Sequence, residues 1–331
     1  MTTITVRRTP APLDVPSYLA FLEREYLTPY VARGGAAVKL IVPQDEETAE
    51  AFAAGLDGLG TGFAHASVSA VTTRIHMIDQ LFAAVARQLD WMDLAQGAVT
   101  RALREAGFEP APGGHLGIAA VAAYHDVDQA ELYRSVRREL ERLVLKDTGL
   151  SHEFRVAMLR LCQSRLDRGD VDEADRETVL GWLCCERVPV GQLRRVSLHG
   201  RIGRHNARAM LLSLTRWLRV AGLRGLVLHL DLERLTVARR PPVGLRDGHY
   251  YTKAAVLDAY EVLRQLIDGT DEFEGLLATV SFPQVLVNDA ARGLAAYTAL
   301  RLRVIDEVHD RTRPNPYSTL VRISLRDEVA A

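Results

Sequence analysis

The sequence predicts an α/β protein: a parallel sheet flanked by helices, with a large all-helical insertion. Three short and nearly continuous apolar runs carry this prediction, at residues 36–42, 225–231 and 275–281. Runs of this length, bounded by glycine, proline or acidic residues, are typical of strands that are buried on both faces. Helical patterns separate the runs along the chain, and such alternation favours parallel strands.

The first half of the α/β domain is predicted at residues 1–90. A helical apolar pattern covers Val15–Arg33 and stops at Gly34-Gly35, as helices commonly do at glycine. The elements predicted after it are a buried strand, an alanine-rich helix, an alternating strand and an amphipathic helix, at residues 36–42, 48–59, 63–68 and 74–89.

The all-helical insertion is predicted at residues 91–187, because no convincing strand pattern interrupts this stretch. Breaks fall at residues 110–114, which read PAPGG, and at residues 167–170, which read DRGD. Helical apolar patterns follow one another around these breaks, at residues 92–106, 116–124, 129–146, 152–166 and 173–184.

The second half of the α/β domain is predicted at residues 188–331. Gly222 ends its first helix, and its first strand ends in the carboxylate of Asp231. The predicted elements alternate between helix and strand and close with an alternating strand, at residues 206–221, 225–231, 252–267, 275–281 and 319–325.

Composition excludes several functional classes. The 331 residues are 48% hydrophobic and 25% charged, with a net charge of −1, so charge on the whole molecule does not argue for nucleic acid. No run of 18 apolar residues is present, and we expect no membrane-spanning helix. Met1–Pro12 lacks the apolar core of a signal peptide, and the three cysteines include only one adjacent pair, too few for a cysteine-based zinc site. We therefore predict a soluble, cytoplasmic protein.

A working phosphate loop is not expected after the first strand. The pattern G-x-x-x-x-G-K-[ST] supplies backbone N–H groups, a lysine and a hydroxyl to a triphosphate. Residues 42–51 contain neither glycine nor lysine, Pro43 removes a backbone donor, and four acids are present, at positions 45, 46, 47 and 50. Like charges about 4 Å apart repel by about 4 kcal/mol near a protein surface. The same acids stabilise the first turn of a helix.

No other segment supplies the phosphate-loop motif. Lysine occurs only at positions 39, 146 and 253, and none of these lysines precedes serine or threonine.

Polar residues at strand ends leave two interpretations open. Asp231 at the end of an apolar run is placed like a Mg²⁺-binding acid, or it serves as a turn or cap residue. Leu232 follows it, and Glu233 comes one position late for a water-activating acid and is expected to point away from Leu232. Ser281 is placed like a sensor of bound nucleotide, or it simply ends a strand. Arg322 senses a phosphate or lies on a solvated strand.

Arginines are concentrated between Arg194 and Arg224, a stretch with eight arginines and no acid. Such a block neutralises phosphates, or it pairs with acids of the helical insertion, or it binds a partner. No interleaved aromatic pattern suggests base stacking. The histidines form no cluster at metal-ligand spacing, and we predict no metal site.

A resemblance to a known family covers nearly the whole chain. Residues 181–190, GWLCCERVPV, are similar to a WL-x-G-E-x-(V/I)-P box of the BREX-type phage-defence ATP-binding proteins, the AAA+-like P-loop ATPases of the D component. Further boxes of that family resemble, in the same order, LRRVSL, IGRHNA and AGLRGLVLHLD, at residues 193–198, 202–207 and 221–231.

The resemblance implies an AAA+-like P-loop fold and an ATP-binding ancestry, with three departures. Ala49 stands about where the phosphate-loop lysine belongs, Leu232 stands where the catalytic glutamate belongs, and the chain ends soon after Leu325, where relatives continue into a helical lid. Losing the lysine and the glutamate removes the electrostatic stabilisation of phosphoryl transfer. The sequence therefore favours a degenerate nucleotide site without catalysis or cofactor, formed by Pro43, Glu46, Thr48, Ala49, Glu50, Asp231, Glu233 and Ser281.

Three functions follow as expectations. The favoured one is a pseudo-ATPase that acts as scaffold or regulatory partner of an intact paralogous ATPase, a helicase or a nuclease. In such assemblies one subunit donates an arginine to its neighbour's site, and the candidates for binding a partner or phosphate are Arg194, Arg195, Arg201, Arg204, Arg208 and Arg322. The alternatives are a weak ATPase that binds Mg-ATP through Asp231 and Glu233, and nucleic-acid binding through the Arg194–Arg224 block.

Overall fold

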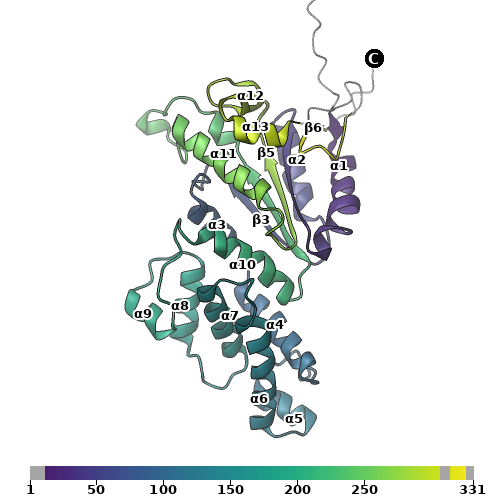
Figure 1. Cartoon of the computed structure of the whole chain (residues 1–331), viewed down its shortest axis with the longest axis vertical. Coiled ribbons are helices and arrows are strands. Elements are labelled where there is room, and N and C mark those ends of the chain that lie inside the picture. The colour runs from purple at the N-terminus through teal and green to yellow at the C-terminus, as the bar shows by residue number, and fades with distance from the viewer. Residues whose placement is uncertain (1–11, 306–313, 326–331) are drawn as a thin grey trace, which may run out of the picture. The chain divides into compact units, whose positions relative to one another are not determined.

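The computed structural model describes residues 12–305 and 314–325 (Figure 1). The stretch Met1–Ala11, on which the expectation of no signal peptide rests, lies outside the described residues. The chain divides into two compact units, one formed by residues 1–77 together with 226–331 and the other by Ile78–Gly225. We call them the sheet unit and the helical unit.

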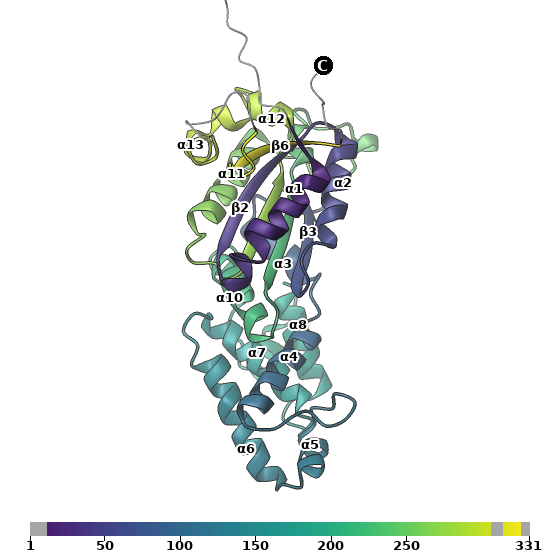
Figure 2. The same cartoon turned by 90° about the vertical axis from the view of Figure 1, so that its right-hand side faces the viewer.

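The sheet unit is built on a sheet of six described strands, confirming the α/β fold class (Figure 2). The strands lie in the order β1-β6-β2-β5-β4-β3, and β6 is parallel to β1 and β2, as β5 is to β2 and β4. Their bounds are β1 Leu13–Asp14, β2 Ala36–Pro43, β3 Phe63–Ser69, β4 Gly225–Asp231, β5 Leu276–Ser281 and β6 Leu320–Ser324. The strand that carries Ser281 thus lies directly between those that end at Pro43 and Asp231.

Helices of the sheet unit cover this sheet, because their apolar sides pack on strands that are almost entirely buried. One core cluster joins Tyr18 and Phe52 to the strand residues Ile41, Val227 and Leu277. The helices are α1 Val15–Phe21, α2 Glu46–Asp57, α11 Lys253–Asp268, α12 Gln284–Asn288 and α13 Thr298–Val304, with short 3₁₀ turns η2 Val31–Arg33, η4 Glu233–Thr236, η5 Val243–Leu245 and η6 Leu294–Ala296.

The prediction of a single helix over Val15–Arg33 is wrong, because this stretch is not one continuous helix. α1 ends at Phe21 and continues as a π-helix, η1 Leu22–Leu27, before a separate 3₁₀ turn that ends at Gly34 with φ of 104°. Buried residues on both sides of the change, Phe21 and Leu22 among them, keep the apolar pattern running. The pattern therefore does not reveal where the hydrogen bonding changes.

The helical unit contains only helices and connections among its described residues before β4 begins, apart from one isolated bridge between Ala111 and His115. Its helices are α3 Ile78–Ala86, α4 Trp91–Glu105, α5 Ile118–His125, α6 Gln129–Leu140 with the π-turn η3 Glu141–Leu145, α7 His152–Arg165, α8 Glu173–Leu183, α9 Val190–Arg195 and α10 Ala207–Val220. The unit extends beyond the insertion predicted at 91–187, because α10 packs against α3 and α4.

None of the helices in the described ranges combines the length and the hydropathy that crossing a bilayer requires.

Candidate functional site

The connection between β2 and α2 is where a phosphate loop belongs, and it is two residues long. β2 ends at Pro43 and α2 begins at Glu46, so only Gln44 and Asp45 lie between them. The backbone N–H of Gln44 donates to the carbonyl of Ile323 on β6, at 3.0 Å. A phosphate loop needs several successive N–H groups turned toward one anion, and this connection is too short to provide them.

The first turn of α2 is capped by the protein's own carboxylate. Asp45 Oδ1 accepts a hydrogen bond from the Thr48 backbone N–H at 2.8 Å and another from the Thr48 hydroxyl at 2.5 Å. Thr48 is fully buried. An N-terminal turn of a helix attracts anions through its free N–H groups and its dipole, and here the Asp45 carboxylate already accepts from one of these N–H groups and adds its own negative charge.

The other predicted residues of this turn add negative charge. Glu46 and Glu47 lie in the first turn of α2 and are exposed, as is Glu50 one turn later. Ala49, at the position of the expected lysine, has no charged group. The amine of Lys39 on β2 is buried and donates to the carbonyls of Tyr317 at 2.7 Å and Ser318 at 3.0 Å.

Asp231 ends β4 with both carboxylate oxygens engaged by the protein. Oδ2 accepts from the hydroxyl of Ser69 at the end of β3, at 2.8 Å, and Oδ1 accepts from the backbone N–H of Glu233 at 2.9 Å. This is the geometry of a residue that closes a turn and ties two neighbouring strand ends together.

Glu233 and Leu232 diverge after β4. Leu232 is fully buried, whereas Glu233 begins the 3₁₀ turn η4 and is largely exposed. Partial burial of the carboxyl raises the pKa of Glu233, and the nearby carboxylates of Asp231 and Glu46 raise it further. The structure thus brings Asp231, Glu233 and Glu46 together at the carboxyl ends of the strands. The donors to Asp231 are a hydroxyl and a backbone N–H, and no cationic side chain is among the groups that shift the pKa of Glu233.

Ser281 belongs to a buried polar set that the sequence analysis did not identify. Its hydroxyl lies 3.4 Å from Nε2 of His229 on β4, and Nδ1 of His229 lies 3.0 Å from the hydroxyl of Thr279. Burial lowers the pKa of His229 to about 4, so the ring is neutral at pH 7. One signal was available: His229 precedes Asp231 by two residues, the spacing that puts two side chains on the same face of a strand.

Arg322 on β6 is half-buried, and its Nε donates to the side-chain oxygen of Gln284 on α12 at 3.3 Å. Burial of the guanidinium lowers its pKa. β6 pairs directly with β2, with Arg322 opposite Val42, so this arginine lies one position before Pro43 in the register. It belongs to the same sheet edge as the candidate site.

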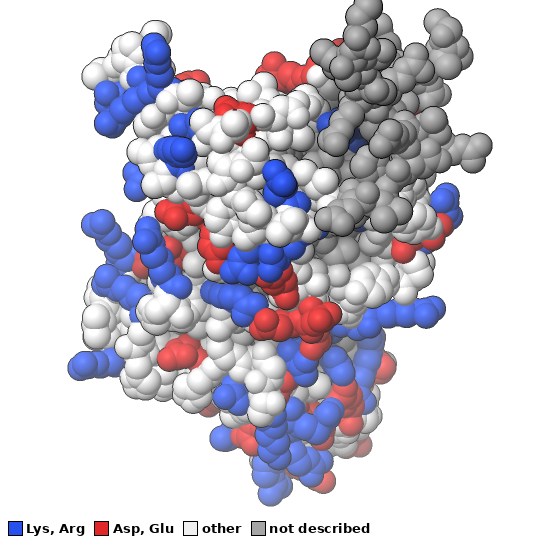
Figure 3. Space-filling model, turned by 45° about the horizontal axis from the view of Figure 1, so that its top comes forward, with Lys and Arg blue, Asp and Glu red and all other residues white. Residues whose placement is uncertain are grey.

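The Arg194–Arg224 block lies in the helical unit and is partly neutralised there. Arg195 pairs with Asp175, with 2.5 Å between Nε and Oδ1, and Arg216 pairs with Asp147 at 2.6 Å. Arg201 donates to the carbonyl of Val188 at 3.1 Å. Blue and red side chains are interspersed over the lower part of the view in Figure 3. Arg194 and Arg204 are exposed, and Arg208 is half-buried on α10.

The side chains at the strand ends are therefore mainly acidic. Asp231 accepts hydrogen bonds from neighbouring protein groups, and Asp45 caps the N-terminus of α2. Within residues 12–305 and 314–325, no three His, Cys, Asp or Glu side chains gather as ligands of one metal ion would. A phosphate loop and a water-activating glutamate directly after Asp231 are not part of this arrangement, since the β2–α2 connection has two residues and Leu232 follows Asp231.

Comparison with known proteins points to one family. A family model described as BREX system ATP-binding protein BrxC/D matches residues 60–327. The match includes Asp231, Ser281 and Arg322, and it begins after the β2–α2 connection. No curated protein and no solved structure matches the chain.

Proposed function

Because the chain belongs to the family of BREX system ATP-binding proteins, we propose that it serves phage defence as a pseudo-ATPase, a non-catalytic subunit that regulates or scaffolds an active partner. The observation that carries this proposal is the β2–α2 connection. Its two residues are fewer than a phosphate loop needs, and a carboxylate, that of Asp45, already lies at the start of α2.

The end of β4 supports the same proposal. Both oxygens of Asp231 accept hydrogen bonds from the protein, and the position of a water-activating glutamate is taken by the buried Leu232. Catalysis of phosphoryl transfer depends on fixed positive charge around the transferred group. The described residues near Asp231 instead contribute the carboxylates of Glu46 and Glu233.

Titration calorimetry with Mg-ATP on the full chain tests the loss of nucleotide binding. We expect no saturable binding tighter than about 1 mM. Binding in the micromolar range that disappears in Asp231→Asn, with the circular dichroism spectrum unchanged, would instead establish the alternative, a weak ATP-binding enzyme that uses Asp231 and Glu233.

The partner proposed for this subunit is an intact ATPase of the same family. An arginine supplied by a neighbouring subunit stabilises the charge that develops in phosphoryl transfer. Arg204 is exposed, and no ion pair within the described ranges involves it, which supports it over Arg195, whose guanidinium is bound to Asp175.

Reconstitution with the paralogous ATPase tests this role. We expect the native chain to change the partner's ATP turnover and Arg204→Ala to lose that effect while still co-purifying. Arg187→Ala is the matched control, because Arg187 is also exposed in the helical unit. Equal effects of both variants, or an ATPase that ignores the native chain, would count against a donated arginine.

A further inference from the structure

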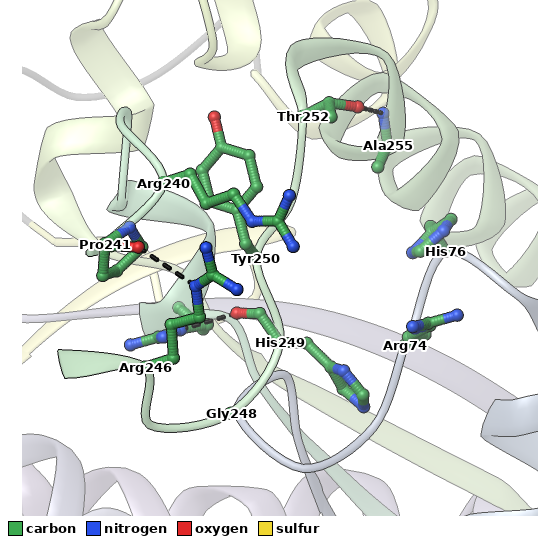
Figure 4. Close-up of a pocket in the computed structure, with 11 residues that line it drawn as sticks. Arg74, His76, Arg240, Pro241, Arg246, Gly248, His249, Tyr250, Thr252 and Ala255 are labelled. Carbon is green, nitrogen blue, oxygen red and sulfur yellow. Dashed lines mark hydrogen bonds between the residues drawn. The ribbon is translucent and has the colours of Figure 1, made fainter. Parts of the chain in front are cut away.

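A second site in the sheet unit has the opposite charge. A cavity of about 430 Å³ opens among the loops that follow β3 and β4. Four arginines and two histidines line it (Figure 4): Arg74, Arg234, Arg240, Arg246, His76 and His249. Ligands of open α/β sheets bind outside the carboxyl ends of the strands, and these loops lie there.

Acidic side chains do not compensate this cluster. The lining of the cavity contains no aspartate or glutamate, and Asp247 is the only acid between Arg234 and Thr252. Asp247 pairs with Arg234, with 3.0 Å between Oδ1 and Nη2, and its own side chain is 80% exposed. This carboxylate pairs with one of the four guanidinium groups, and the side chains that line the cavity carry a net positive charge.

The loops that carry the arginines are held in place by their backbones. The carbonyl of Val71 accepts from the N–H of His249 at 2.9 Å. Gly248 has φ of 97°, and a Cβ there would lie 2.4 Å from the same carbonyl. Arg234 Nε donates to the carbonyl of His249 at 2.7 Å, and the hydroxyl of Tyr251 donates to the carbonyl of Thr73 at 2.5 Å. The cationic groups are thus presented by an ordered frame.

The start of α11 adds to the positive potential. This helix of 16 residues begins beside the cavity, with Thr252 as its N-cap and no acid in its first turn. The first turn of α2 differs, since it carries Glu46 and Glu47. A long helix without an acid in its first turn directs the positive end of its dipole toward a nearby anion, and Lys253 at the first position of α11 adds a positive charge.

We propose that this cavity binds the phosphates of a nucleic-acid backbone. Guanidinium groups form bidentate, charge-assisted hydrogen bonds with phosphate oxygens. Arg74 and Arg240 are exposed on separate loops, so they meet successive phosphates of a chain. Figure 4 shows Arg240 and Arg246 among the side chains that line the cavity. The site is distinct from the Arg194–Arg224 block, and it does not depend on the loss of ATPase activity.

Fluorescence anisotropy with a short fluorescein-labelled DNA, as single strand and as duplex, tests the proposal on the full chain at low salt. We expect the double variant Arg240→Ala/Arg246→Ala to bind about tenfold more weakly for each arginine removed. The slope of log affinity against log salt should decrease by about 2. The control is Arg33→Ala/Arg301→Ala, which removes the same charge from exposed positions of the sheet unit and should bind like the native chain.

Three results would overturn the cavity as the site. The first would be that the native chain binds neither form of the DNA at low salt. The second would be that the control weakens binding as much as the cavity variant does. The third would be that only Arg194→Ala/Arg204→Ala weakens binding, which would place the nucleic acid on the helical unit. ATP that competes as well as the oligonucleotide at equal phosphate concentration would show a free-nucleotide site and would also reject the proposal.

Discussion

Asp45 is a single residue that stabilises the start of α2, because its carboxylate accepts hydrogen bonds from the backbone N–H and the hydroxyl of Thr48. We expect Asp45→Ala to lower the free energy of unfolding by about 1 to 2 kcal/mol, because the N-cap bond is lost and the hydroxyl of the buried Thr48 loses its acceptor. Urea unfolding followed by circular dichroism measures this change. The variant should still bind no Mg-ATP, since the connection remains two residues long.

Glu50→Ala is the matched control for Asp45→Ala. Glu50 is exposed on the same helix and one turn further along, so its removal should change stability by less than about 0.5 kcal/mol. Equal effects of the two substitutions would show that general charge repulsion, and not the cap, sets the stability of α2.

His229 makes the stability of the sheet unit depend on pH. Its pKa falls from 6.5 to about 4 on folding, because burial disfavours the charged ring. Between these values the unfolded chain binds a proton that the folded chain does not. The free energy of unfolding therefore falls as pH drops through this window, by at most about 1.4 kcal/mol per pH unit from this group.

Comparison with His229→Gln isolates the histidine from the carboxyl groups that titrate in the same range. The native chain should lose stability relative to the variant as pH falls from 6.5 to about 4, and the difference should be constant above that window. A difference that is the same at every pH would mean that folding leaves the pKa of His229 unchanged, and that burial does not lower it.

The helices and strands show which elements can be predicted from apolar patterns in the sequence. The apolar runs predicted as strands at 36–42 and 225–231 are β2 and β4, and the final alternating run contains β6, because burial between helices requires such runs. α9 was not predicted, since its six residues are too few to show a period. The two-residue length of the β2–α2 connection is also not predicted: the alanine-rich pattern places the helix start at Thr48, although the acids before it suit a first helical turn, where Glu46 and Glu47 lie.

Packing between elements decides the effect of one glycine. Gly97 lies within α4, where alanine normally stabilises a helix by about 1 kcal/mol. A Cβ at Gly97 would lie 2.1 Å from the carbonyl oxygen of Ala221, which follows α10. We expect Gly97→Ala to destabilise the helical unit by about 1 to 3 kcal/mol, measured by thermal unfolding.

Gly58→Ala serves as the comparison, because a Cβ there meets nothing within 4 Å and its φ is −96°. This variant should unfold within about 0.5 kcal/mol of the native chain. If Gly97→Ala changes the free energy of unfolding as little as Gly58→Ala does, the close contact between α4 and Ala221 does not matter for stability.

The chain divides into two compact units, and its tryptophans lie in only one of them. All three tryptophans, Trp91, Trp182 and Trp217, are buried in the helical unit. Phe52→Ala removes a fully buried ring from the sheet unit at a cost of about 3 to 5 kcal/mol. We expect it to shift part of the circular dichroism transition in urea and to leave the midpoint of tryptophan fluorescence unchanged.

Phe154→Ala is the reciprocal variant, since Phe154 is fully buried on α7. It should move the fluorescence midpoint, because its ring packs against Trp91 with 6.2 Å between centroids. Coincident shifts of both signals in both variants would reveal a single cooperative unit.

The linear sequence by itself determined the fold class, most strands and helices, and the absence of a phosphate-loop motif, since these follow from local patterns of apolar residues, glycine and charge. The predicted insertion boundaries and the cytoplasmic location remain predictions. Only the tertiary structure decided that Asp231 is bound to Ser69, that His229 lies between Thr279 and Ser281, and that Arg74 lines the same cavity as Arg240 and Arg246. These residues lie far apart in the chain, and folding of the sheet brings them together.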